Sequence, residues 1–222
     1  MTQPQARILV VDDERNIRKN LSLMLEAAGH LVDMVGDGED ALLKCKEQPY
    51  DIAFVDLQMP HMGGLELLRH LRALSATTAV VILTAYGSVA RAVEAMKLGA
   101  MDFLEKPFDP KTIRLLTEEI LLRQRLGLSG SVEDLLHVAE LARGRQAFGE
   151  ARAYLKTAML RDLARPEPYY WLGYLCEFEG DLRQATHYYC MAREANHTFQ
   201  PALDALRCLG QLDHKTGKEG ED

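Results

Sequence analysis

The chain contains 222 residues, of which 47% are hydrophobic and 27% are charged, a balance that excludes a fibrous or intrinsically disordered protein. Because domains cluster near ~100–150 residues, this length predicts two of them. The net charge of -7 is spread along the chain, with 15 basic and 18 acidic residues in positions 1–129 and 11 and 15 in positions 130–222. Neither part has the positive surplus that a phosphate backbone attracts, so we expect no nucleic-acid partner.

The cysteines and the hydropathy pattern indicate the compartment. Cys45, Cys176, Cys190 and Cys208 form no close C-x-x-C pair, and the sequence has no signal peptide and no apolar run approaching ~18 residues. We therefore expect a cytoplasmic protein without membrane insertion. Its thiols are expected to be reduced, because free cysteine behaves as a small buried hydrophobe, although the sequence also permits a bridge between Cys176 and Cys190.

Between residues 7 and 126, short β-branched runs alternate with longer helical ones. Continuous apolar runs such as "ILVV" and "IAFV" are typical of strands buried on both faces of a parallel sheet. Five βα units in series therefore predict an α/β fold with a doubly wound five-stranded parallel sheet. The expected strands are Arg7–Asp12, Leu31–Val35, Asp51–Asp56, Ala79–Thr84 and Met101–Glu105. The expected helices are Glu14–Ala28, Gly38–Lys46, Leu65–Ala73, Ser88–Leu98 and Pro110–Leu126.

The pattern changes after residue 126. "GLSGS" at 127–131 is typical of a short linker, and every later segment is helical in pattern. Within this part the sequence repeats with a period of 34 residues. The matching pairs are Leu135 and Tyr169, Ala139 and Gly173, Ala151 and Ala185, Leu155 and Tyr189, and Ala158 and Ala192.

This repeat resembles the tetratricopeptide repeat (TPR), whose two helices place small residues where they cross. The resemblance implies an all-α TPR-like helical domain at 132–213, with repeats at 132–165 and 166–199, a capping helix at 201–212 and a disordered tail at 214–222. Two departures stand out. Trp171 lies two positions after the usual tryptophan, and Gln146 occupies the place where glycine usually marks the turn.

Polar side chains follow several of the predicted strands. Asp12 and Asp13 end the first, Asp56 the third and Thr84 the fourth, and Lys106 follows the fifth. Because the carboxyl ends of parallel strands meet at one edge of the sheet, we expect these groups to converge there. Three carboxylates at one edge repel each other unless a cation separates them, and hard oxygen ligands favour Mg²⁺.

Simpler interpretations of the same residues stay open at this point. Asp12 alone is compatible with a helix N-cap, and Asp13 with a favourable charge at a helix N-terminus. Thr84 is compatible with an ordinary strand end and Lys106 with a solvated turn. Their expected convergence favours the functional interpretation.

Four segments, "VVDD", "FVDLQMPHMGG", "LTAYG" and "FLEKPF", resemble in order and spacing the receiver domain of bacterial two-component response regulators. The resemblance covers residues 5–126 and implies a flavodoxin-like receiver domain at 1–126. It implies that Asp56 takes a phosphoryl group from a sensor histidine kinase or a phosphotransfer protein. It further implies the metal ligands Asp12, Asp13, Asp56 and the backbone carbonyl of Gln58, the phosphate contacts Thr84 and Lys106, and a cis Lys106–Pro107 bond.

Other phosphate chemistry fits this sequence less well. A flavodoxin-type protein needs hydroxyls and amides after the first strand, where this chain has acids. A haloacid-dehalogenase-type phosphatase needs a second aspartate two residues after its nucleophile, and the residue there is Gln58, which cannot transfer the proton. We therefore expect no enzyme beyond the chain's own phosphoryl transfer and slow dephosphorylation, and a phosphoryl-Asp56 that persists.

The resemblance also implies a switch formed by Thr84 and Phe103. Phosphorylation would draw Thr84 toward the phosphate and let Phe103 turn inward. Because phenylalanine lacks the hydroxyl of the family's common tyrosine, we expect Phe103 to sit inward more often than that tyrosine and to leave the basal activity higher. Phe103 is equally compatible with an ordinary core position. The readout surface would be Ser88–Leu126, through which two copies could also pair as a homodimer.

For the second half, the resemblance implies a groove that binds a protein or peptide. The residues expected along it are Leu136, Glu140, Arg143, Tyr170, Tyr174 and Glu177. Tyr170, Tyr174 and Phe178 exceed what the repeat core needs, so they suit a ligand surface or packing on the receiver or capping helix. We expect a response regulator whose TPR output binds a protein under phosphorylation control. The alternatives are a phosphate-sink receiver whose repeats localise it, and a transcriptional regulator.

Overall fold

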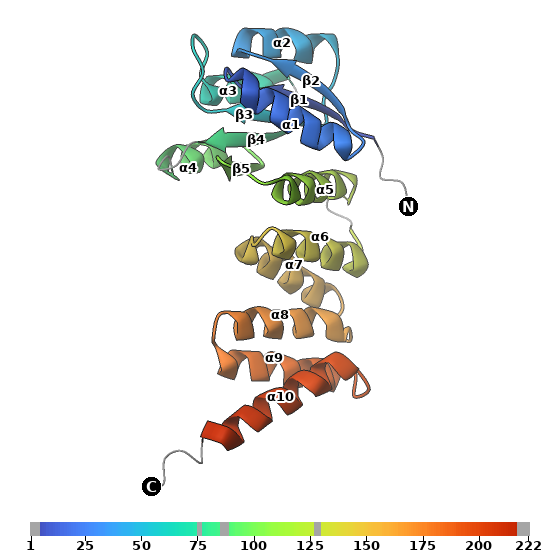
Figure 1. Cartoon of the computed structure of the whole chain (residues 1–222). Coiled ribbons are helices and arrows are strands. Elements are labelled where there is room, and N and C mark those ends of the chain that lie inside the picture. The colour runs from blue at the N-terminus through green and yellow to red at the C-terminus, as the bar shows by residue number, and fades with distance from the viewer. Residues whose placement is uncertain (1–4, 75–76, 85–88, 127–129, 217–222) are drawn as a thin grey trace. The chain divides into compact units, whose positions relative to one another are not determined.

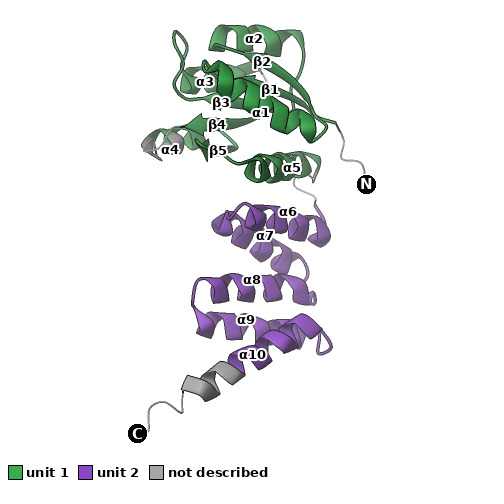
Figure 2. Ribbon diagram, viewed as in Figure 1, with its two compact units in different colours: residues 1–125 green, residues 126–222 purple. Residues whose placement is uncertain are grey.

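A computed structural model describes residues 5–74, 77–84, 89–126 and 130–216. The chain divides into two compact units, Met1–Arg125 and Leu126–Asp222 (Figure 2). Within the described residues, no helix combines the length and the apolar character that a membrane crossing requires.

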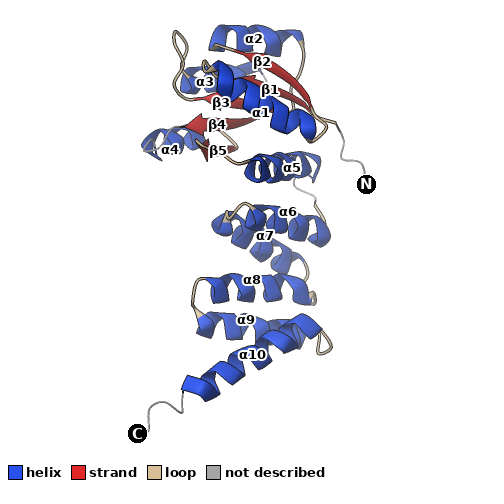
Figure 3. Ribbon diagram, viewed as in Figure 1, coloured by secondary structure: helices blue, strands red, loops and turns tan. Residues whose placement is uncertain are grey.

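The first unit alternates strands and helices along its whole length (Figure 3). Its strands are all parallel and lie in the order β2-β1-β3-β4-β5, which confirms the predicted doubly wound sheet. Every described strand and helix begins and ends within one residue of the predicted bounds. The strands are β1 (Arg7–Val11), β2 (Leu31–Val35), β3 (Ile52–Asp56), β4 (Ala79–Thr84) and β5 (Asp102–Glu105). The helices are α1 (Arg15–Ala27), α2 (Gly38–Glu47), α3 (Gly64–Leu74), α4 (Val89–Lys97) and α5 (Pro110–Leu126).

Both faces of this sheet are buried, which explains the continuous apolar strands. Ile8 and Val10 of β1 pack in the cluster that contains residues of α1 and α5, whereas Leu9 and Val11 pack in the cluster that contains residues of α2 and α3. Figure 1 shows these helices around the strands of the sheet. All four of these side chains are 0% exposed. Since β1 lies between β2 and β3, the strand order reverses at β1, and the carboxyl ends of β1 and β3 open the crevice where doubly wound folds bind ligands.

In the second unit, the described residues 130–216 form helices joined by short turns and no strands. The helices are α6 (Val132–Gly144), α7 (Phe148–Arg161), α8 (Pro166–Phe178), α9 (Leu182–Ala195) and α10 (Gln200–Thr216). The starts of α6 and α8 differ by 34 residues, and so do those of α7 and α9, which is the period found in the sequence. The last helix is longer than the predicted 201–212 and takes in residues 214–216 of the predicted tail. Positions 211–216 contain no glycine or proline that would end the helix earlier.

The two hairpins of this unit use different residues at equivalent places. Gln146 adopts a positive φ of 66° where the second hairpin has Gly180 at 84°, so the left-handed turn of the first hairpin forms without glycine. At the helix crossing, Ala139 and Leu155 of the first hairpin are replaced by Gly173 and Tyr189. Tyr169, Leu172 and Cys176 are buried in the core of the second hairpin, and all four cysteines are free thiols, as predicted.

Candidate functional site

The polar groups that end the strands converge at one edge of the first unit. Asp12 follows β1 directly, Asp56 is the last residue of β3 and Thr84 the last of β4. Ligand oxygens of Asp12, Asp13 and Asp56 all lie within 4.8 Å of one another. Asp12 is 0% and Asp56 5% exposed, whereas Asp13 is exposed. The structure therefore assembles the predicted acid group, with two members held in the protein and one open to solvent.

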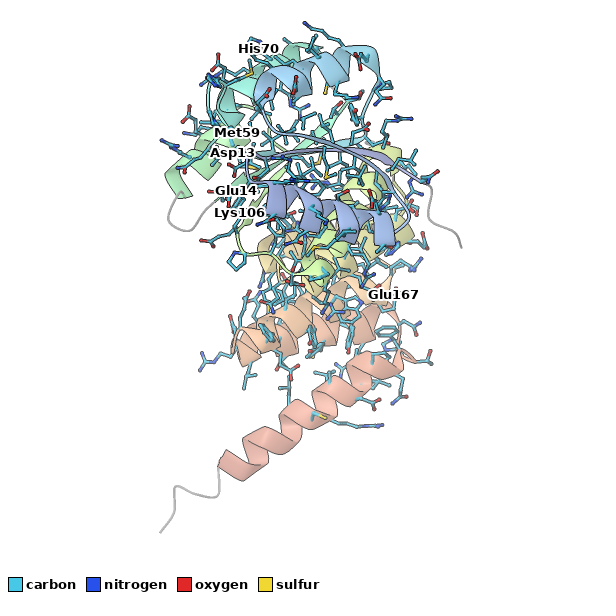
Figure 4. All side chains as sticks on the ribbon, turned by 45° about the horizontal axis from the view of Figure 1, so that its top comes forward. Asp13, Glu14, Met59, His70, Lys106 and Glu167 are labelled. Atoms are coloured by element: carbon cyan, nitrogen blue, oxygen red, sulfur yellow. The ribbon has the colours of Figure 1, made fainter. Side chains whose placement is uncertain are left out.

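Lys106, which follows β5, supplies positive charge to this group. Its Nζ lies 2.7 Å from Oδ2 of Asp12 and 2.9 Å from Oδ1 of Asp56. Oε1 of Glu14 is 3.8 Å from the same nitrogen. Figure 4 labels Asp13, Glu14 and Lys106 along this edge of the unit. Lys106 is thus no solvated turn lysine, because its ammonium joins the carboxylates of two different strands.

These contacts and the burial change how the groups ionise. Burial raises the pKa of Asp56, and the hydrogen bond from Lys106 opposes this rise. Burial by itself lowers the pKa of Lys106, but its hydrogen bonds to Asp12 and Asp56 outweigh that effect and raise it. Lys106 therefore keeps its proton, and Asp56 is a more basic carboxylate than an exposed aspartate.

The loop after β1 is fixed by its own hydrogen bonds. Oδ1 of Asp12 accepts from the backbone N–H of Glu14 at 2.8 Å, and Arg18 of α1 donates to the carbonyl of Asp12. The N-cap of α1 is Glu14, which makes no side-chain capping bond. The simpler interpretation of Asp12 as the cap of α1 is therefore wrong, and its second oxygen is left for Lys106.

The loop after β3 holds Asp56 from the other side. The backbone N–H of Gln58 donates to Oδ2 of Asp56 at 3.1 Å, and the N–H of Gly64 donates to the carbonyl of Leu57 at 3.1 Å. Gly64 approaches so closely that a Cβ built on it would lie 2.2 Å from the carbonyl oxygen of Asp56. After β5, the Lys106–Pro107 bond is cis, as the resemblance implied.

The two predicted switch residues differ in burial. Thr84 is buried at 4% exposure, beside the acid group in the next strand. Phe103 is 42% exposed, so the interpretation as an ordinary core residue is wrong, and the structure has the outward position rather than the inward one. The physical reason is the alternation along β5, an edge strand, which turns Asp102 and Leu104 inward and leaves Phe103 outside.

Several residues predicted for a groove in the second unit do lie together. Leu136, Glu140 and Arg143 of α6 line a small pocket with Trp171 of α8. The guanidinium carbon of Arg143 lies 4.8 Å from the ring centroid of Trp171 and 5.7 Å from that of Tyr174. Trp171 is the residue that the sequence analysis missed as part of this surface, although its spacing of three from Tyr174 places both on one helix face.

The other aromatic residues of α8 contact different parts of the second unit. Tyr170 packs against Phe199, the residue before α10, with ring centroids 5.8 Å apart, and contacts the cluster that contains Ala205 and Leu206. For Tyr170, packing on the last helix is therefore the correct alternative. Phe178 is 63% exposed, and its ring centroid lies 4.9 Å from that of Phe148 of α7. Phe178 therefore contacts the first hairpin. Glu177 accepts a hydrogen bond from the Tyr189 hydroxyl at 2.6 Å.

Among known proteins, the chain is similar to several bacterial regulators. The two-component response regulator PhoP of Pseudomonas aeruginosa is 36% identical over 152 residues, which cover 68% of this chain and 67% of PhoP. The transcriptional regulatory protein ZraR of Klebsiella oxytoca is 38% identical over 133 residues, covering 60% of this chain and 30% of ZraR. The transcriptional regulatory protein FixJ of Rhizobium meliloti is 42% identical over 104 residues, covering 47% of this chain and 51% of FixJ. The chain thus spans from 30% to 67% of the length of these relatives.

Solved structures agree with the fold of the first unit. A response regulator receiver domain protein from Clostridium thermocellum matches with a TM-score of 0.53 at 32% identity, covering 55% of this chain and 98% of that one. NtrX from Brucella abortus matches with a TM-score of 0.54 at 32% identity, covering 55% of this chain and 28% of NtrX. The family model described as the response regulator receiver domain matches residues 8–118, which contain β2 to β5, all of β1 but its first residue, and the whole acidic edge. The chain therefore belongs to the response regulators, with a receiver domain as its first unit.

Proposed function

We propose that this protein is a phosphorylation-controlled adaptor, in which Asp56 receives a phosphoryl group and the helical unit binds a partner protein. The phosphorylation of Asp56 is supported by the surroundings of this residue. Its buried carboxylate lies 2.9 Å from the Lys106 ammonium and forms a group with Asp12 and Asp13. A carboxylate forms an acyl phosphate that is readily reversed, which suits a signal rather than a product.

The acid group suits a divalent cation. Three carboxylates that can each turn an oxygen to a common point supply hard ligands, and the buried Asp12 and Asp56 need positive charge beyond that of Lys106. We infer that Asp12, Asp13 and Asp56 hold Mg²⁺ together with the backbone carbonyl of Gln58. When bound, the ion would offset negative charge on the transferred group.

The chain's own residues then have distinct tasks. A carboxylate oxygen of Asp56 forms the bond to phosphorus as the phosphorus–nitrogen bond of the donor histidine breaks. Lys106 pairs with a phosphoryl oxygen, and the Thr84 hydroxyl bonds another. Gln58, two residues after Asp56, offers an amide that cannot take a proton from water, so hydrolysis is slow and the signal lasts.

A surface beside Lys106 suits the phosphodonor. Pro107 and Phe108 after β5 and Ile17 of α1 line a hollow of about 420 Å³ that also contains Lys106. Residues of α1 and α5 line a neighbouring hollow of about 660 Å³. Leu23 of α1, which lines the larger hollow, is a large apolar side chain that is 54% exposed. We assign this surface to the docking of a sensor histidine kinase or a phosphotransfer protein. Because such donors act in the cytoplasm, we propose that compartment for the regulator as well.

The output role rests on the second unit. Its hairpins repeat every 34 residues and alternate small and large residues at their crossings, as tetratricopeptide repeats do. That resemblance, together with the half-buried aromatic residues of α8 and the exposed charged residues of α6 and α8, supports a protein-binding unit at 132–213. Several relatives are named transcriptional regulators, so DNA binding is the second candidate, to be tested by a salt-dependent gel shift.

Replacing Asp13 by asparagine is expected to abolish most stabilisation by magnesium while leaving the metal-free protein unharmed. Asp13 is exposed, so its change costs less than ~0.5 kcal/mol, whereas saturating magnesium stabilises the wild type by about 2.7 kcal/mol at a hundredfold excess over Kd. Thermal unfolding with added magnesium or a chelator measures both effects. The exposed Asp40→Asn change on α2 is the matched control and should respond to magnesium like the wild type. An Asp13→Asn protein that magnesium stabilises fully would contradict the assignment.

The adaptor role is tested by capture from a lysate of the source cell. The full chain with magnesium and beryllofluoride, which mimics the phosphoryl group, is compared with the same chain carrying Asp56→Ala. We expect a partner that is retained only by the wild type in the mimic state. Equal retention by both would show constitutive binding and would favour a phosphate-sink receiver whose helices localise it.

A further inference from the structure

Charge is segregated between the two sets of helices in the second unit. The first helices of the two hairpins, α6 and α8, carry five acidic residues and one basic residue. The second helices, α7 and α9, carry two acidic and five basic residues. The two layers of the hairpins therefore carry opposite net charge, although the unit as a whole is only mildly acidic.

Not all of the acids on α6 and α8 are available. Glu133 and Glu167 both pair with Arg165, and Asp134 closes the capping box of α6 with Ser131. Glu140 and Glu177 remain exposed to solvent, Glu140 at the rim of the pocket with Trp171, and Glu177 one turn beyond Tyr174. The bond from the Tyr189 hydroxyl to Glu177 fixes the orientation of that carboxylate, which lowers the entropy lost when it binds a cation.

A row of aromatic rings on α8, the helix that also carries Glu177, already holds a cation. Trp171 makes edge contacts with Tyr170 at 5.1 Å and with Tyr174 at 5.6 Å. The Arg143 guanidinium lies over Trp171 at 4.8 Å. Aromatic faces attract cations through their quadrupole, and a guanidinium stacks on them well. The rings are thus arranged so that a positive side chain is stabilised there.

We propose that this surface, defined by Glu140, Arg143, Trp171, Tyr174 and Glu177, binds a basic segment of the partner protein. Lysine or arginine side chains of that segment pair with Glu140 and Glu177 and pack their stems on the rings, while an apolar residue packs over the shallow hollow lined by Leu136 and Ala139. This inference rests on the proposed output role and adds the chemical class of the ligand.

An acidic segment suits the surface poorly. It would face the exposed carboxylates of Glu140 and Glu177 on both sides, and Arg143 alone would attract it. Like charges placed together at an interface cost several kcal/mol and suppress the wrong partner. The surface therefore selects by charge sign as well as by the aromatic contact.

The test uses the full chain and two short labelled peptides. In one, lysine and arginine alternate with leucine, and in the other glutamate replaces every basic residue. Anisotropy of the label reports binding, and Trp171, the chain's single tryptophan, reports contact at the surface itself. We expect the basic peptide to bind at least about tenfold more tightly than the acidic one and to change the fluorescence of Trp171.

Variants locate the site. Glu140→Gln with Glu177→Gln keeps the side-chain size and an acceptor for the Tyr189 hydroxyl, and it is expected to weaken the basic peptide about tenfold. The matched control, Glu39→Gln on α2 with Glu194→Gln on α9, removes the same charge from exposed positions elsewhere and is expected to leave the affinity within about twofold. Equal weakening by both pairs would show attraction to net charge alone and would overturn the proposal.

Failure of the basic-ligand proposal can be told apart from failure of the adaptor role. A partner captured only in the beryllofluoride state and retained equally by the Glu140→Gln, Glu177→Gln chain would keep the output role and refute the basic ligand. Specific peptide binding that is identical with and without beryllofluoride would keep the basic ligand and refute phosphorylation control.

Discussion

Replacing Gly64 by alanine is expected to prevent phosphorylation of Asp56 and to destabilise the first unit by about 2–3 kcal/mol. The new Cβ would lie 2.2 Å from the carbonyl oxygen of Asp56 and 3.0 Å from its carbonyl carbon and from Cα of Leu57. These neighbours are backbone atoms, so no side-chain rotation relieves the clash. The chain must shift at Asp56, which moves its carboxylate away from Asp12 and Lys106.

Gly63 provides a matched control in the same loop. A Cβ on Gly63 would lie 3.7 Å from the carbonyl of Leu57, an ordinary contact, so Gly63→Ala is expected to be close to neutral. Stability is read from far-UV circular dichroism, and phosphorylation from the mobility of the protein after treatment with a small phosphodonor. If Gly64→Ala is phosphorylated at the wild-type rate, the close approach does not position Asp56.

The sequence predicted the acidic edge because a parallel sheet brings strand ends together whatever the side chains do. Asp12, Asp56 and Thr84 end adjacent strands, so their convergence follows from strand order alone. The bounds of the helices followed from similarly local signals, such as Gly29 and Gly99, which both adopt a φ of 93° just after α1 and α4.

Features that depend on side-chain packing were not predictable in this way. The outward position of Phe103 is set by which face of an edge strand is covered, and spacing along the chain does not encode it. The stacking of Arg143 on Trp171 joins residues of different helices and depends on the rotamer that each side chain adopts. The approach of Gly64 to Asp56 likewise appears only once the loop between β3 and α3 has its path.

The second large loss of stability is expected from a substitution at the helix crossing of the second hairpin, at Gly173. A Cβ on Gly173 would lie 2.6 and 2.7 Å from ring atoms of Tyr189 and 3.2 Å from the carbonyl oxygen of Ala185. The Tyr189 ring is 1% exposed and its hydroxyl is bonded to Glu177, so the ring cannot move aside without losing that bond. We expect Gly173→Ala to destabilise the second unit by about 2–3 kcal/mol, although alanine is the better helix former.

The first hairpin indicates how the loss can be reversed. There the equivalent residues are Ala139 and Leu155, which pack in one buried cluster, so alanine fits opposite leucine. In a Tyr189→Leu background, Gly173→Ala is therefore expected to be neutral or to stabilise by up to ~1 kcal/mol. The difference between the two backgrounds is the interaction energy of the pair.

Fluorescence of Trp171 makes this cycle measurable within the full chain, because the single tryptophan lies in α8 and follows the second unit alone. Gly149→Ala in α7 is the control, since nothing lies within 4 Å of its Cβ position, and it is expected to stabilise by up to ~1 kcal/mol. An equal cost of Gly173→Ala in both backgrounds would mean that the carbonyl of Ala185 sets the spacing of α8 and α9. A cost confined to the tyrosine background would establish that the ring does, and that each hairpin closes with its own matched pair of residues.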